Sequence, residues 1–459
     1  MTIMNAIEPD VVEIDRNAVW HHLTQHQAFE MVDPLVAVEG KGLIITDAKG
    51  REFLDATSGG VWSVNIGYGR ESMGRVVGEQ LTKMCFFAGT GGTVPGALFA
   101  EKLLDKMPGM GRVYYSNSGS EANEKAYKMV RQLAHLKGDG RKHKVIYRHR
   151  DYHGTTIAAL SSTGQEQRRA DYGPFVDGFV EFANCDRYRT SFVGGEEEFA
   201  EFSANDLERV ILQEGPDTVG SVILEPITAG GGVIVPPKGY FERIQEICRQ
   251  YDVLLHMDEV VCAFGRTGKW FGYEHFGVKP DIVTMAKGVA SGYAAISCTV
   301  TTEDIFNGFK SDNQDPLGYF RDISTFGGCA GGHAAALENI RIIQEEKLVD
   351  NARVIGAYFK DKLFELAEKH EVIGDVRGLG LLLGLELVKD RNTREPLDEA
   401  EIVRFQGLCM AHDLMIGRTN RSFNKLNNTI CLTPALIAAK SDIDEIVSRL
   451  DQAFGLLAA

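Results

Sequence analysis

Short apolar runs alternate with longer segments of helical periodicity from about residue 69 onward. Apolar runs of four to eight residues predict buried strands, and apolar residues recurring every three or four positions predict helices. The predicted strands are 112–116, 144–149, 219–226, 253–260 and 280–287, and helical segments include 121–136 and 239–252. This alternation predicts an α/β fold with a mainly parallel sheet that is covered by helices on both faces.

The pattern changes after Gly332, where a long helical run over residues 333–370 is followed by a strand-like run over 380–388. We interpret this part as a second, smaller α/β domain. The predicted division is an N-terminal segment 1–66 that contributes to the small domain, a large domain 67–335 and a C-terminal small domain 336–459.

Composition narrows the possible partners. The chain has 459 residues and a formal charge of −15, so no broad positive field favours nucleic acid or an anionic membrane. The N-terminus lacks the pattern of a secretory signal, and no apolar run approaches the length of a membrane helix, which predicts a cytoplasmic protein. The eight cysteines are scattered and no histidines cluster, which favours reduced thiols and no metal site.

Polar residues follow the predicted strands where each strand ends, at Ser118, Glu225, Asp258 and Lys287. In a parallel sheet these carboxyl ends share one edge, and ligands bind there. Lysine is rarely buried without a partner, so Lys287 either reaches water or has a chemical role. A carboxylate such as Asp258 is commonly a cap or an ion-pair partner, but two successive strands here deliver an acid and an amine to one edge.

The segment YYSNSGSEANEKAYK places small residues between a strand and a helix. The backbone N–H groups of Gly119 and Ser120 can face an anion at the positive end of the helix. The alternative is a capping box, with Ser118 as N-cap and Glu121 three residues later, and both can hold together.

An amine, an acid and an anion cradle on one edge fit pyridoxal 5'-phosphate, which needs a lysine for covalent attachment, a carboxylate beside its ring nitrogen and donors for its phosphate. Lys287 can also serve as the base in such a site if burial lowers its pKa. The segment RDYHGTT supplies Tyr152 and His153, whose rings can stack on a flat cofactor, although packing is the commoner role.

These motifs together resemble the class III, or ω-amino acid, aminotransferases of fold-type I. The resemblance covers nearly the whole chain and includes FLDATSGGVWSVNIGYG, YYSNSGSEANEKAYK, YHGTT, LLHMDEVVCAFGRTGKWFGYE, PDIVTMAKGVASGY, STFGG and VRGLGLLLGLEL. It implies a fold-type I pyridoxal-phosphate-dependent transferase, with a large domain built on a mainly parallel seven-stranded sheet plus a smaller α/β domain.

The resemblance also implies roles for single residues. Lys287 would form the Schiff base, and Asp258 would pair with the ring nitrogen. Thr325 would reach the phosphate of a neighbouring subunit, so that a homodimer or a dimer of dimers completes the site. The implied cofactor-binding residues are Gly119, Ser120, Tyr152, His153, Glu225, Asp258, Val260, Lys287 and Thr325.

For substrates, the resemblance implies an amine donor and a 2-oxo acid acceptor. Arg418 best matches the arginine that pairs with the acceptor's carboxylate, because a guanidinium binds a carboxylate or sulfonate with two hydrogen bonds. Arg421 and Lys425 lie close by, and a solvated surface loop is the alternative. Trp62 matches an aromatic wall above the substrate, whereas for Phe86 and Phe87 we favour core packing.

Within the family, VWHHLTQH, DATSGGVW, KMCFFAGTGGTVPGALFAEKL and DYHGTTIAALSSTGQ resemble the taurine:pyruvate enzymes. This implies transfer from taurine to pyruvate, giving sulfoacetaldehyde and L-alanine. β-Alanine is a competing donor, and a 4-aminobutyrate or ornithine-type enzyme that uses 2-oxoglutarate is a rival. A mutase or decarboxylase of the same fold, or a catalytically silent cofactor-binding protein, are weaker alternatives.

Overall fold

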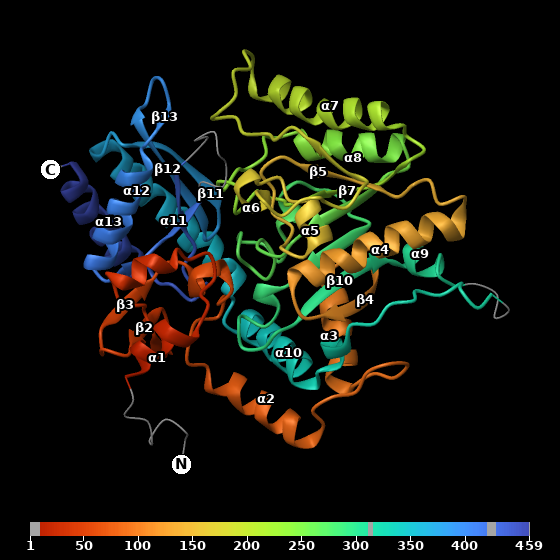
Figure 1. Ribbon diagram of the computed structural model, residues 1–459, viewed down its shortest axis with the longest axis horizontal. Coiled ribbons are helices and arrows are strands. Elements are labelled where there is room, and N and C mark those ends of the chain that lie inside the picture. Colours follow the sequence, from red (N-terminus) through yellow and green to blue (C-terminus); the bar gives the residue numbers. More distant parts are fainter. Residues whose placement is uncertain (1–9, 311–314, 420–427, 459) are drawn as a thin grey trace.

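A seven-stranded sheet is at the centre of the computed structural model, which describes residues 10–310, 315–419 and 428–458 (Figure 1). The strand order is β4-β10-β9-β8-β7-β5-β6. The strands are β4 (Met110–Ser116), β5 (Lys144–Arg148), β6 (Phe179–Phe182), β7 (Val219–Leu224), β8 (Leu254–Asp258), β9 (Ile282–Met285) and β10 (Ser297–Thr302). Only β10 runs antiparallel to its neighbours in this sheet, so the predicted mainly parallel sheet is confirmed.

Helices cover both faces of this sheet. On one face, α4 (Gly119–Lys137) packs Ala126, Val130 and Leu133 against Ile282. On the other face, α8 (Tyr240–Gln250) belongs to the main core together with Met257 of β8. Burial on both sides explains why every residue of β7 is buried and why Ser221 is the one polar side chain in this strand.

Other helices surround the sheet or extend from it: α1 (Val11–Ala18), α2 (Glu71–Lys83), α3 (Val94–Leu104), α5 (Ile157–Ser161), α6 (Glu166–Arg169), α7 (Glu196–Glu214) and α9 (Glu303–Asn307). Of the helices that the structure describes, none combines the length and apolarity required to cross a membrane.

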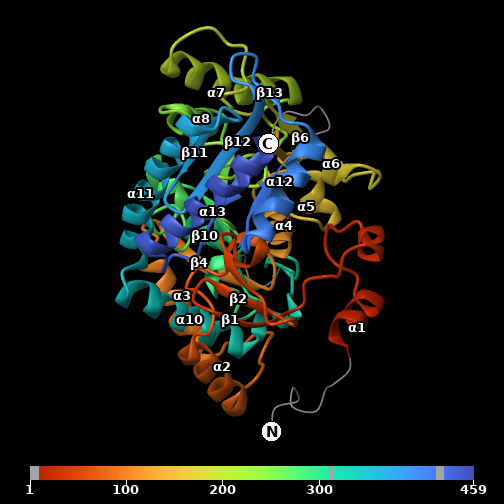
Figure 2. The same ribbon diagram turned by 90° about the vertical axis from the view of Figure 1, so that its left-hand side faces the viewer.

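Strands from the N-terminal and C-terminal parts of the chain pair in one sheet. A four-stranded sheet has the order β1-β2-β3-β14, and β3 pairs with β14 in parallel, with Leu54 opposite Leu414. Its strands are β1 (Ala37–Lys41), β2 (Ile44–Asp47), β3 (Glu52–Asp55) and β14 (Leu414–Met415). The red N-terminal strands and the blue C-terminal elements accordingly lie side by side in Figure 1 and Figure 2. The predicted domain boundaries themselves stay a prediction.

A third sheet, of order β11-β12-β16-β15, builds the C-terminal part. Its strands are β11 (Ile373–Leu379), β12 (Leu382–Asp390), β15 (Gly417–Thr419) and β16 (Thr429–Leu432), with β13 (Glu395–Pro396) paired to β12. Helices α12 (Glu399–Ala411) and α13 (Lys440–Ala458) pack against each other, and α12 also contacts β14. The long helical run expected over 333–370 is two helices, α10 (Ala330–Glu345) and α11 (Leu348–Lys369), because Lys347 between them adopts a left-handed conformation with φ 53°.

Candidate active site

One cavity of about 420 Å³ lies at the carboxyl edge of the large sheet, where β8 and β9 end and α4 begins. Eight of the predicted site residues line it together, although they are spread over 169 positions of the chain (119–287). They are Gly119, Ser120, Tyr152, His153, Glu225, Asp258, Val260 and Lys287.

Asp258 ends β8 and is held by three donors. Its Oδ2 accepts hydrogen bonds from His153 Nδ1 and Asn123 Nδ2, both at 2.8 Å, and its Oδ1 accepts from the backbone N–H of Val260 at 3.0 Å. Burial acts to raise the pKa of Asp258, but these hydrogen bonds and the charge of His153 outweigh it and leave the pKa below its ordinary value. Asp258 is therefore a buried carboxylate that stays ionised next to the cavity.

Glu225, just after β7, behaves in the opposite way. Its oxygens accept from the backbone N–H groups of Tyr152 at 2.8 Å and Ala229 at 3.1 Å. Burial, followed by the nearby Asp151 and Asp258, nevertheless raises the pKa of Glu225 well above its ordinary value. The surroundings of the two acidic groups in the cavity thus shift their pKa values in opposite directions, down for Asp258 and up for Glu225.

Lys287 follows β9 in a short 3₁₀ turn, Lys287–Val289, and its backbone has φ 36°. Burial lowers the pKa of its amine, against the opposing effect of Asp258 and Glu225. A lower pKa increases the uncharged fraction of the amine, which is the form that acts as a nucleophile or a base.

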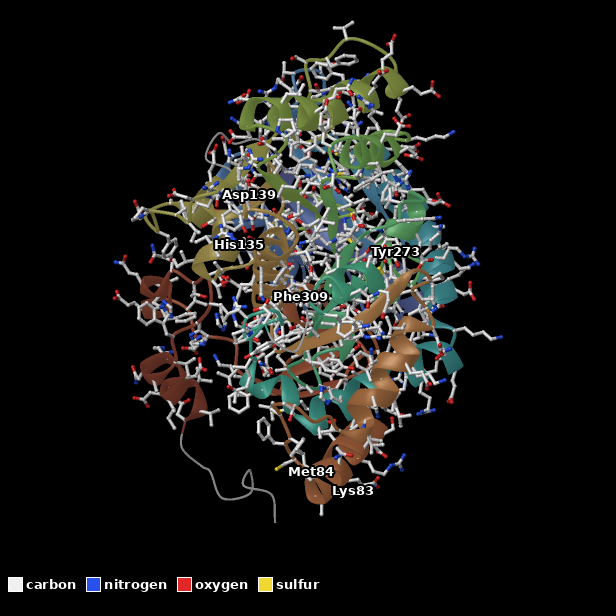
Figure 3. All side chains as sticks on the ribbon, turned by 90° about the vertical axis from the view of Figure 1, so that its right-hand side faces the viewer. Lys83, Met84, His135, Asp139, Tyr273 and Phe309 are labelled. Carbon is white, nitrogen blue, oxygen red and sulfur yellow. The ribbon has the colours of Figure 1, made fainter. Side chains whose placement is uncertain are left out.

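The start of α4 lines the cavity with Ser118, Gly119 and Ser120. Ser118 caps the helix by accepting from Glu121 N–H at 3.2 Å, while the carboxylate of Glu121 turns back to Asn117 N–H at 2.8 Å. The predicted cap is therefore present, but the return bond of a capping box goes to the residue before Ser118. The opposite end of this helix, marked by His135 and Asp139, lies on the side of the molecule that faces away from the small sheets (Figure 3).

Gly119 leaves space that a side chain would fill. A Cβ at this position would lie 3.0 Å from Cγ2 of Val260, which itself lines the cavity. The first backbone N–H groups of α4 therefore lie in a cavity that also contains an ionised carboxylate, an amine and the ring of Tyr152. This set of donors and acceptors fits a phosphorylated, protonated aromatic ring such as pyridoxal phosphate.

Three predicted residues lie outside the lining of this cavity. Trp62 has a backbone φ of 65°. Its ring lies close to Gly230 and Gly417, since a Cβ atom added to these glycines would come within 3.9 Å and 3.5 Å of the ring, respectively. Thr325 is exposed in a short 3₁₀ helix, Thr325–Gly328. The roles of these two residues stay predictions.

Arg418 is the third of these residues and lies on β15. Its Nη2 donates to Glu399 Oε1 at 2.8 Å, whereas its Nη1 is buried without a hydrogen-bond partner among the described residues. A buried guanidinium nitrogen with unused donors is compatible with a ligand anion. The neighbouring Arg421 and Lys425 lie outside the described residues.

The expectation of core packing for Phe86 and Phe87 was wrong. Their exposed fractions are 39% and 49%, and the ring of Phe86 lies 6.5 Å from that of Phe326, which is also exposed. The segment that contains them forms an isolated antiparallel β-bridge between Phe86 and Cys329 and is not part of a named strand. Hydrophobic side chains in this segment instead form part of the surface.

Sequence patterns missed one residue that contacts the predicted acid. Asn123 lies on the buried face of α4 and donates to Asp258 and to the backbone carbonyl of His153. A polar amide on an otherwise apolar helical face was the available signal, since a buried amide requires partners.

Comparisons with known proteins agree with this geometry. The family model described as aminotransferase class-III matches residues 26–454. The chain is 59% identical to the hypotaurine/taurine–pyruvate aminotransferase of Paracoccus denitrificans over 96% of each chain. It is 58% identical to the taurine–pyruvate aminotransferase of Rhodobacter capsulatus, covering 98% of this chain and 97% of that protein. The solved ω-transaminase of Pseudomonas jessenii in complex with PMP superposes with a TM-score of 0.92 at 32% identity, covering 98% of each chain.

Proposed function

We propose, from the premise that the chain belongs to the class-III aminotransferase family, that it transfers the amino group of taurine to pyruvate, giving sulfoacetaldehyde and L-alanine. The observation that carries the reaction class is the convergence of Lys287, Asp258 and the start of α4 on one cavity. The names of two relatives at 58% and 59% identity support the donor and the acceptor.

Pyridoxal phosphate would be held by residues that already face one another. Gly119 and Ser120 would donate backbone N–H groups to its phosphate, and Asp258 would accept from its ring nitrogen. Tyr152 and Val260 would contact its ring, and Lys287 would attach it covalently. When bound, this cofactor withdraws electrons from the carbon that carries the amino group.

The protein's own groups would supply the proton transfers. The lowered pKa of Lys287 suits it to take a proton from the amine-bearing carbon of the donor and to return a proton later. Asp258 would remain ionised and hold a proton on the ring nitrogen, since its three hydrogen bonds favour the carboxylate. Glu225, whose pKa is raised, would take up a proton more readily than Asp258 and would hold the backbone of Tyr152 through its hydrogen bond.

Arg418 would bind the carboxylate of pyruvate or the sulfonate of taurine through its unpartnered Nη1. We also propose a homodimer or a dimer of dimers, in which the exposed Thr325 reaches the phosphate of the neighbouring subunit. The exposed rings of Phe86 and Phe326 beside it are suited to a covered interface. A cytoplasmic location stays a prediction.

Alanine formation tests the proposed function. The purified chain is supplied with pyruvate and with taurine, β-alanine or 4-aminobutyrate in parallel, and each donor is repeated with 2-oxoglutarate. We expect alanine to form fastest with taurine and little transfer to 2-oxoglutarate. Faster transfer from another donor would overturn the taurine assignment, and glutamate formation would favour the 4-aminobutyrate or ornithine-type alternative.

A further inference from the structure

A buried chain of polar side chains continues beneath Asp258, away from the cavity. β8 and β9 are parallel neighbours in which Asp258 lies opposite Thr284 and His256 lies opposite Ile282. Because side chains alternate along a strand, His256 and Asp258 point to the same face of the sheet, which α4 covers at Asn123. His256, Thr284 and Asn123 have no exposed surface.

The positions of the hydrogen atoms in this series of hydrogen bonds can be assigned from the donor–acceptor distances. Both amide hydrogens of Asn123 are used, toward His153 O at 2.7 Å and Asp258 Oδ2 at 2.8 Å. The Thr284 hydroxyl donates to Asn123 Oδ1 at 2.7 Å, so it can only accept from His256 Nε2 at 3.0 Å. His256 must therefore carry its hydrogen on Nε2.

The state of His256 agrees with this assignment. Burial lowers the pKa of His256 to about 3, so the ring is neutral and carries one hydrogen. Its Nδ1 is buried without a hydrogen-bond partner among the residues that the structure describes. The neighbouring Tyr127 on α4, whose ring lies 6.2 Å from that of His256, has its hydroxyl hydrogen-bonded to Ser162, and the hydrogen bond of His256 is with Thr284.

We propose that Thr284 and His256 are positioning residues of the cofactor site, because they fix the Asn123 amide in the one orientation that donates to Asp258. An amide turned the other way would place its oxygen against the Asp258 carboxylate and the His153 carbonyl. Hydrogen bonds in such a chain polarise one another, so the outer members strengthen the bond that Asp258 receives. This inference rests on the proposed function only in taking pyridoxal phosphate as the ligand of Asp258.

A pH dependence follows for cofactor binding. Ionised Asp258 binds the protonated ring nitrogen, so affinity falls as the pH falls through the pKa of Asp258. Loss of a donor raises that pKa, and the fall in affinity then begins at a higher pH. The other titratable side chains that act on Asp258 from the surrounding elements are Tyr127, Tyr152, His153, Glu225, His256, Glu259, Cys262 and Lys287.

The test is the dissociation constant of pyridoxal phosphate, measured for the full chain from neutral pH down to about pH 3, because the pKa of Asp258 lies below its ordinary value of about 3.9. Thr284→Val removes the hydroxyl at nearly constant volume. We expect affinity at neutral pH to fall about threefold to tenfold and the pH midpoint to rise by about half a unit to one unit. Thr284→Ser should restore both.

Thr299→Val is the matched control. Thr299 is equally buried in the neighbouring strand β10, and its hydroxyl donates at 2.8 Å to Ala122 O of α4, but this bond does not reach Asp258. The control should lose stability while it keeps the wild-type pH midpoint. His256→Phe, which removes only the outer donor, should shift the midpoint in the same direction by a smaller amount, and it replaces Thr284→Val if that variant does not fold.

Equal pH midpoints in Thr284→Val, Thr299→Val and the wild type would overturn the inference, as would loss of affinity by the same factor at every pH. Equal midpoints in His256→Phe and the wild type would do the same. A wild-type chain that binds no pyridoxal phosphate would instead overturn the proposed function, and this inference with it.

Discussion

Gly119→Ala should weaken cofactor binding without unfolding the protein. The added methyl group would lie 3.0 Å and 3.2 Å from the two methyl carbons of Val260, where ordinary carbon contacts are about 3.5–4.0 Å. Gly119 is the first residue of α4 and has no positive φ, so its backbone accepts alanine. Val260 must therefore move, and the space available to it is the cavity that it lines.

The size of the effect follows from this contact. Overpacking of a close-packed site costs about 1–3 kcal/mol, which corresponds to roughly 5-fold to 150-fold in a binding constant. In the free protein Val260 can shift into the cavity, so the cost should fall mainly on the loaded state. We expect the dissociation constant of pyridoxal phosphate to rise by this factor, while the melting temperature of the cofactor-free chain changes little.

A matched control is Gly78→Ala in α2, where a new methyl group meets no atom within 4 Å. This variant should bind the cofactor like the wild type and should be slightly more stable, since alanine favours helices over glycine. Both variants are titrated with cofactor and melted without it. If Gly119→Ala binds the cofactor within a factor of two of the wild type, the assignment of Gly119 and Val260 to the cofactor site is refuted.

Three further predictions concern residues around the site. Arg418→Ala should raise KM for pyruvate roughly tenfold to a hundredfold, because charged hydrogen bonds to its carboxylate are lost. KM for an amine donor without an acidic group should change far less. Equal increases in KM for both substrates in steady-state assays would indicate a structural role. Asp322→Asn should cost about 1–3 kcal/mol of unfolding free energy at neutral pH, because Asp322 accepts from Lys125 at 2.8 Å and Tyr114 at 3.0 Å. These partners outweigh burial and hold the pKa of Asp322 below its ordinary value. The contribution of Asp322 to the free energy of unfolding is therefore present above about pH 4 and is lost as the pH falls through the folded-state pKa. A difference in melting temperature between Asp322→Asn and the wild type that persists in acid would contradict this. Thr325→Ala, at an exposed position, should leave the melting temperature of the free chain unchanged but raise the dissociation constant of the cofactor about threefold to tenfold, and unchanged binding would remove Thr325 from the neighbouring site.

The strands that end at the site could be predicted because apolar residues predominate in each, with single polar residues inside them at Ser221, His256 and Thr284. Glu225 follows β7 directly, Asp258 ends β8 and Lys287 lies two residues after β9, so the strand ends bring all three to the cavity. β10 has the sequence SCTVTT, whose threonines break the apolar run, and its antiparallel insertion between β4 and β9 depends on pairing with both strands. Local patterns contain no information about such pairing.

Residues that act through tertiary contacts were harder to find. The break between α10 and α11 occurs at Lys347, where no glycine or proline marks it. Asn123 contacts Asp258 only because α4 crosses the end of β8, so sequence spacing gave no reason to join them. The exposure of Phe86 and Phe87 likewise depends on the packing of a segment that has no strong periodicity of its own.

The most direct measurement of the central claim is the residue to which the cofactor attaches. The wild-type chain is loaded with pyridoxal phosphate, treated with borohydride to make the linkage permanent, digested and mapped by mass spectrometry, with Lys287→Ala as the control. We expect one cofactor per chain on the peptide that contains Lys287 and none at that position in the control. A label on another lysine, or no label on a chain that still forms alanine, would contradict the assignment of this cavity as the active site.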